Sequence, residues 1–79
     1  MKFQYSRTSV KYLHTLEKKM ASKILNAVED LPRKGDIRPL KGREIRNIFR
    51  LRIGKYRIIY SVEKDLIKVI RIDTRGDVY

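Results

Sequence analysis

The densest concentration of residues able to do chemistry lies between positions 41 and 57. Seven basic residues face the single acid Glu44 in this window: Lys41, Arg43, Arg46, Arg50, Arg52, Lys55 and Arg57. Arginine is permanently charged and presents two parallel N–H groups to two oxygens of one phosphate. For any single arginine a solvated surface position is the commoner role, but three that converge favour a phosphate-binding surface.

A predicted β-hairpin brings three of these arginines together. Apolar and polar residues alternate on both sides of residues 54–55, which have the composition of a tight turn. A two-residue loop would place Arg52 directly opposite Arg57 and leave Arg50 on the same face. The other face would carry six apolar side chains: Phe49, Leu51, Ile53, Tyr56, Ile58 and Tyr60. Like charges directly across a strand pair repel, and a bound phosphate would relieve that repulsion.

Periodicity predicts the elements that support this hairpin. Residues 2–5 alternate and indicate a short strand, and residues 66–73 are rich in Ile and Val and indicate another. Residues 33–42 contain two glycines and Pro39, which is typical of a loop. No repeat or linker divides the chain, so we expect a single domain over residues 1–79.

From Ser6 to Leu31 apolar residues recur every three or four positions, which predicts helix. They are Val10, Leu13, Leu16, Met20, Ile24, Ala27, Val28 and Leu31. We favour two helices of about 9 and 12 residues, folded as a hairpin, over one long helix, because two helices cover a small sheet better. Ser6 or Thr8 can cap the first helix, and the break falls near residues 17–19.

The resulting order is β-α-α-β-β-β. This order predicts an α+β fold in which a helical hairpin packs on one face of a small, mostly antiparallel sheet. The apolar face of the β-hairpin has the helical stripe to pack against, whereas the arginine-bearing face does not. We therefore expect the arginines on the side of the sheet away from the helices.

Composition sets limits on the class of protein. The 79 residues include 20 Lys and Arg against 9 Asp and Glu, which gives a net charge of +11. The absence of cysteine excludes disulfides and Cys-ligated zinc, and His14 alone cannot anchor a metal, so we expect no metal and no cofactor. No apolar run is long enough for a membrane span, so we expect a cytoplasmic protein with a polyanionic partner.

Three segments, taken in order, resemble the RelE/ParE superfamily of bacterial and archaeal toxins. They are Leu40–Gly42 (LKG), Phe49–Tyr60 (FRLRIGKYRIIY) and Asp73–Tyr79 (DTRGDVY). The resemblance implies a toxin neutralised by a cognate antitoxin, which we expect to be acidic and RelB-like, with a heterotetramer as one possible assembly. In the RelE branch it implies a ribosome-dependent endoribonuclease that cuts messenger RNA without metal, through attack of a 2′-hydroxyl on the adjacent phosphate, and so inhibits translation.

The same resemblance assigns catalytic roles by position. Arg57 matches the arginine that contacts the scissile phosphate, and Arg75 matches a second arginine that stabilises the phosphate and the leaving group. Tyr79 matches a C-terminal tyrosine that orients or activates the 2′-hydroxyl. All three are expected to be catalytic.

Substrate-binding roles are expected for Lys41, Arg50 and Arg52, although a solvated lysine in a loop turn fits position 41 equally well. Ile48 and Thr74 depart from the family pattern, which has lysine and histidine in some members at these positions. The general acid and base are therefore not identified. The preferred function is a RelE-like messenger-RNA endonuclease. The alternatives are a ParE-like inhibitor that binds DNA gyrase without catalysis, and a basic nucleic-acid-binding module.

Overall fold

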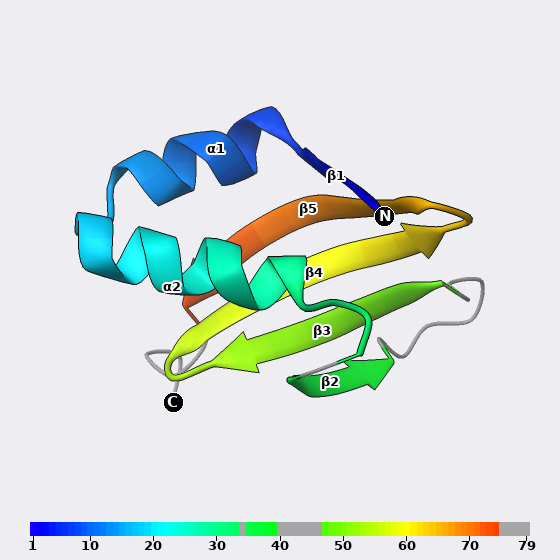
Figure 1. Cartoon of the computed structure of the whole chain (residues 1–79). Helices are drawn as coiled ribbons and strands as arrows, with labels where there is room; N and C mark the ends of the chain where they lie inside the picture. The colour runs from blue at the N-terminus through cyan, green and yellow to red at the C-terminus, as the bar shows by residue number, and fades with distance from the viewer. Residues whose placement is uncertain (34, 40–46, 75–79) are drawn as a thin grey trace.

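A computed structural model describes residues 1–33, 35–39 and 47–74 of the chain. These residues form two helices and five strands (Figure 1). In chain order the elements are β1 (Lys2–Tyr5), α1 (Arg7–His14), α2 (Lys18–Glu29), β2 (Asp36–Pro39), β3 (Ile48–Ile53), β4 (Tyr56–Glu63) and β5 (Leu66–Thr74). None of the helices in these three ranges is long and apolar enough to cross a membrane.

The five strands form one sheet in the order β1-β5-β4-β3-β2. β1 runs parallel to β5, and every other neighbouring pair is antiparallel. Both helices lie on the same face of this sheet (Figure 1). The expected α+β fold, with a helical hairpin on one face of a mostly antiparallel sheet, is confirmed.

The helical region divides into two helices, as we favoured over one long helix, but the break lies at residues 15–17, and Lys18 and Lys19 already belong to α2. α1 contains 8 residues and α2 contains 12. Ser6 is the N-cap of α1, where its hydroxyl oxygen accepts a 3.2 Å hydrogen bond from the backbone N–H of Ser9. This bond satisfies one of the amides that the first helical turn leaves unpaired. Leu31, just beyond α2, is buried, and the helix stops before Pro32.

β2 lies inside the segment that was predicted to be a loop, so that prediction is wrong for residues 36–39. The strand pairs with β3 at the edge of the sheet. Pro39, which favoured the loop, is the last residue of this edge strand, where the absence of an N–H group is tolerated. Gly35 precedes the strand with φ near +120°, and a Cβ at this position would lie 2.5 Å from a side-chain carbon of Leu51.

The β3–β4 hairpin has the predicted register. Ile53 pairs with Tyr56 across a two-residue turn, and Arg52 stands opposite Arg57. Gly54 opens the turn with φ of +56°, a conformation that glycine adopts without strain. The loop length on which the arginine convergence depends is therefore confirmed.

A β-bulge interrupts the pairing of β4 with β5. Tyr60 opposes Val69, but the preceding residue Ile59 opposes Arg71, so Ile70 is an extra residue in β5. An extra residue reverses the alternation of the strand that follows it. Arg71 consequently lies on the face of the sheet away from the helices.

The hydrophobic core lies between the helices and the sheet. Its buried residues are Leu13, Ile24, Val28, Leu31, Leu51, Tyr56, Ile58, Tyr60, Ile67, Val69 and Ile72. The six apolar residues predicted for one face of the hairpin all belong to this core or pack against it, as expected. Val10 is an exception in the helical stripe, because it is exposed on α1.

Candidate active site on the arginine face

Among the described residues, five arginines lie on the face of the sheet opposite the helices, which we call the arginine face. They come from the four strands β2 to β5: Arg38, Arg50, Arg52, Arg57 and Arg71. Residues directly opposite one another in neighbouring strands share a face. The pairs Arg38 with Arg50, Arg52 with Arg57, and Ile59 with Arg71 fix this placement.

The arginine face has two rows of side chains that run across the strands. One row contains Arg38, Arg50, Ile59 and Arg71, in that order from β2 to β5. The next row contains Asp36, Arg52, Arg57 and Asp73, in that order from β2 to β5. Residues two apart on a strand are about 6.8 Å apart, so the rows are close enough for their side chains to meet.

Asp73 connects the rows through its carboxylate. The Nε–H of Arg57 donates a 3.1 Å hydrogen bond to Oδ1, and Nη2 donates a 3.0 Å bond to Oδ2. The Nε of Arg71 lies 3.1 Å from the same Oδ2. Arg57 and Asp73 therefore form a two-bond pair of the kind that gives strong and well-oriented contacts between guanidinium and carboxylate.

The environment of this pair is partly dehydrated. The Arg57 side chain is 25% exposed and that of Asp73 is 19% exposed, whereas Arg71 is 68% exposed. A half-buried ion pair is less screened by water and salt than one on a fully exposed surface. In the two rows the strand register places five arginines with two aspartates, Asp36 and Asp73, which gives a net of three positive charges.

The structure brings three of the predicted site residues together. Arg50, Arg52 and Arg57 share the arginine face, with Arg50 and Arg57 half-buried and Arg52 exposed. Lys41, Arg75 and Tyr79, to which binding and catalytic roles were assigned, lie outside the described residues. Their roles stay predictions.

Asp73, Arg71 and Arg38 were not among the predicted site residues. A signal for Asp73 and Arg71 exists in the sequence, because an uninterrupted β4–β5 hairpin would place Arg71 opposite Ile58 in the core. That conflict indicates a bulge, and the bulge places Asp73 opposite Arg57. Arg38 was missed together with β2.

Two tyrosines of the sheet belong to the packing rather than to the arginine face. Tyr60 is buried in the core and stacks on Phe49, with ring centroids 5.7 Å apart. Burial raises the pKa of Tyr60 above its ordinary value of 10.0. Burial, with a smaller contribution from the Glu29 carboxylate, also raises the pKa of Tyr5. Both phenols stay neutral at neutral pH, and the prediction that Tyr60 is a core residue is confirmed.

Several solved structures similar to this chain are toxin–antitoxin complexes. The archaeal RelE–RelB complex from Pyrococcus horikoshii OT3 gives a TM-score of 0.77 at 30% identity, covering 95% of this chain and 94% of that chain. The RelB–RelE complex from Methanococcus jannaschii gives 0.75 at 29% identity, covering 96% and 94%. The RelBE2 complex from Mycobacterium tuberculosis gives 0.75 at 27% identity, covering 96% and 92%. These likenesses define the class as a toxin of the RelE/ParE superfamily.

A family model narrows the identification. Residues 3–79 match the family described as the ParE toxin of the type II toxin–antitoxin system parDE. The chain therefore belongs to this family, and the predicted superfamily is confirmed. A search of curated proteins gives no match to the sequence.

Proposed function

We propose that the protein is a ribosome-dependent endoribonuclease that cuts messenger RNA and thereby inhibits translation. The observation that carries this proposal is the in-register placement of Arg52 and Arg57 on the face away from the helices, in a chain 30% identical to an archaeal RelE. A fold alone does not specify an activity. The arginine face supports the proposal because its guanidinium groups are suited to binding a phosphate of the RNA.

The proposed reaction uses groups that the RNA itself contains. The 2′-hydroxyl of a ribose attacks the neighbouring phosphorus, the bond to the 5′-oxygen of the next nucleotide breaks, and the products are a 2′,3′-cyclic phosphate and a 5′-hydroxyl. The protein must hold the attacking and leaving oxygens in line and neutralise the charge that develops on the phosphoryl oxygens. Guanidinium groups on a half-buried surface suit both tasks.

In this proposal Arg57 contacts the scissile phosphate, with Arg50, Arg52 and Lys41 binding the neighbouring RNA backbone. Arg75 stabilises the developing charge and the leaving group, and Tyr79 orients or activates the 2′-hydroxyl. An ordinary tyrosine has a pKa of about 10, so nearby cations are needed to make it a base near neutral pH.

A cognate antitoxin is the proposed partner. The P. horikoshii, M. jannaschii and M. tuberculosis relatives were solved as complexes with RelB-type antitoxins, and a YoeB–YefM complex from Staphylococcus aureus is heterotetrameric. With a net charge of +11, this chain favours fast association with an acidic partner. We propose an acidic, RelB-like antitoxin that covers the arginine face, in the cytoplasm.

The second candidate is a ParE-like inhibitor of DNA gyrase that catalyses nothing. The observation in its favour is the family model itself, which is described as the ParE toxin of parDE. A ParE-like protein would act through gyrase and leave messenger RNA intact.

Purified protein in a translating extract with cognate ribosomes separates the two candidates. The endoribonuclease is expected to give new 5′ ends within translated codons of a defined message, and no such ends when translation is blocked before initiation. A parallel assay with cognate gyrase is expected to show normal supercoiling. Inhibited gyrase together with an intact message would overturn the proposal in favour of the second candidate.

A further inference from the structure

The Asp73 carboxylate lies on the arginine face, at the β5 end of the row that contains Arg52 and Arg57. It accepts hydrogen bonds from Nε and Nη2 of Arg57 and contacts Nε of Arg71. We propose that Asp73 is a positioning residue, which fixes the Arg57 guanidinium in the plane and direction needed to contact the scissile phosphate. This inference rests on the proposed function.

The geometry of the guanidinium group decides whether the contact with Asp73 orients Arg57 toward a phosphate or blocks its contact with one. An arginine carries five N–H bonds, one on Nε and two on each terminal nitrogen. The pair with Asp73 uses the Nε–H and one N–H of Nη2. The remaining N–H bonds, on Nη1 and Nη2, point away from Asp73. The edge that they form matches two oxygens of one phosphate. Asp73 therefore fixes the direction in which this second edge points.

The neighbours of Arg57 explain why such an anchor is needed. Arg52 stands directly opposite Arg57 on β3, and like charges in this arrangement repel. Asp73 stands directly opposite Arg57 on the other side, on β5. The carboxylate offsets the repulsion and holds the long side chain in one rotamer. A fixed rotamer matters because a misplacement of about 1 Å at a reacting group can slow a reaction about 100-fold.

The bulge at Ile70 is the structural device that creates this pair. Without the extra residue, Ile72 would stand opposite Arg57 and Asp73 would face the helices. The bulge therefore moves Arg71 and Asp73 together onto the arginine face. Arg71, which is mostly exposed, supplies a second contact to Oδ2 and limits rotation of the carboxylate.

The test compares Asp73→Asn with Asp65→Asn, which removes the same charge from the exposed turn between β4 and β5. Initial rates of cleavage by each variant are measured at multiple turnover over a range of concentrations of cognate ribosomes with message, to separate kcat from KM. Asp73→Asn is expected to lower kcat about 10- to 100-fold with KM unchanged or lower, since the phosphate still meets a positive surface. Asp65→Asn is expected to match the unsubstituted protein. Asp73→Glu, which keeps the carboxylate on a longer side chain, is expected to recover part of the loss in kcat.

A second measurement does not depend on activity. In the isolated protein, the Nε–H of Arg57 is expected to give a resolved, slowly exchanging NMR signal that persists in Asp65→Asn and disappears in Asp73→Asn. Equal or faster cleavage by Asp73→Asn would overturn the inference and identify Asp73 as a competitor for the phosphate. Absent cleavage by the unsubstituted protein would refute the proposed function, and the NMR comparison would still decide whether Asp73 anchors Arg57.

Discussion

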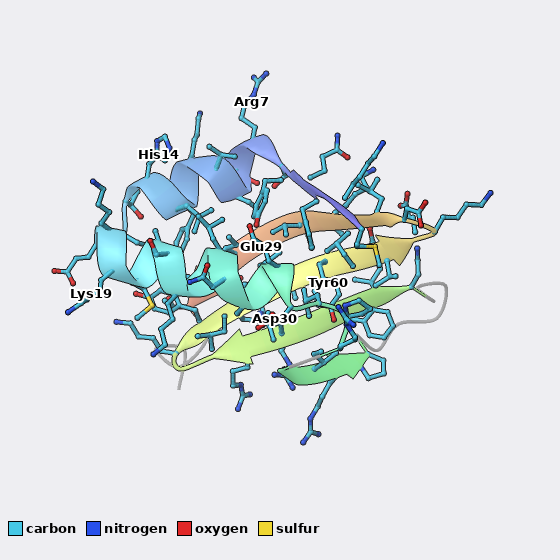
Figure 2. All side chains as sticks on the ribbon, viewed as in Figure 1. Arg7, His14, Lys19, Glu29, Asp30 and Tyr60 are labelled. Carbon is cyan, nitrogen blue, oxygen red and sulfur yellow. The ribbon has the colours of Figure 1, made fainter. Side chains whose placement is uncertain are left out.

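The two faces of the sheet differ in what their side chains do. The face beneath α1 and α2 is apolar, and its central strand residue Ile58 is 0% exposed. The arginine face carries ion pairs and cations, although Ile59 in its centre is only 8% exposed. Figure 2 shows Tyr60 between the sheet and α2, while Arg7, His14 and Lys19 project from the helices into solvent. One face stabilises the fold, and the other concentrates charge on a rigid support.

This difference shows how a small chain can carry its hydrophobic core and its candidate active site on opposite faces of one sheet. Alternation along β3 and β4 sends every second residue to each face, so one hairpin supplies core and site together. Sites built on strands are held more firmly than sites on loops. The core face should therefore govern stability, and the arginine face should govern activity.

The largest expected effect is the loss of packing on the helix face. Ile58→Ala removes a completely buried side chain and is expected to lower the free energy of unfolding by about 2–5 kcal/mol. Lys68→Ala, an exposed change on β5, is expected to alter it by less than about 0.5 kcal/mol. Urea denaturation of both variants checks the contrast, which fails when the two losses are similar.

A smaller effect is expected from the ion pair on the arginine face. In a double-mutant cycle with Arg57→Ala and Asp73→Ala, the coupling energy is expected to be about 1–3 kcal/mol, because the pair is half-buried and joined by two charged hydrogen bonds. Chemical denaturation of the four proteins measures it. A coupling energy near zero would show that this ion pair contributes no more to stability than an ion pair on an ordinary solvated surface.

The smallest effect concerns alkaline pH. Because the pKa of Tyr60 is raised in the folded protein, the folded state holds this proton more tightly than the unfolded chain does. The associated stability is fully present below pH 10 and falls as the pH rises through the folded pKa. Tyr60→Phe is expected to show a shallower loss of stability above pH 10 in denaturation measured as a function of pH. An equally steep loss would show that Tyr60 is not the group responsible.

Much of the fold could be predicted because, over most of the chain, only one strand register or helix orientation buries the apolar residues. The alternation on either side of Gly54, interrupted at Ile48 and Ile59, leaves a single register that puts the six predicted apolar residues on the helix face, so the opposition of Arg52 and Arg57 followed from it. The helix stripe behaves in the same way, except that Val10 is exposed.

The remainder depended on features that local patterns describe poorly. A four-residue edge strand that ends in proline has the composition of a loop, and only its pairing with β3 makes it a strand. The bulge at Ile70 depends on the conflict between Arg71 and the core, which is evident only when β4 and β5 are considered as a pair. Asp73 was missed for this reason, although two hydrogen bonds join it to Arg57.

The central claim is that activity belongs to the arginine face and not to the positive charge of the chain as a whole. Arg57→Ala and Arg7→Ala each remove one arginine, the first from the arginine face and the second from the exposed surface of α1 (Figure 2). The most direct measurement maps 5′ ends of a translated message on cognate ribosomes with each variant. We predict that the codon-position ends disappear with Arg57→Ala and persist unchanged with Arg7→Ala. Equal cleavage by the two variants, or equal loss, would contradict the account.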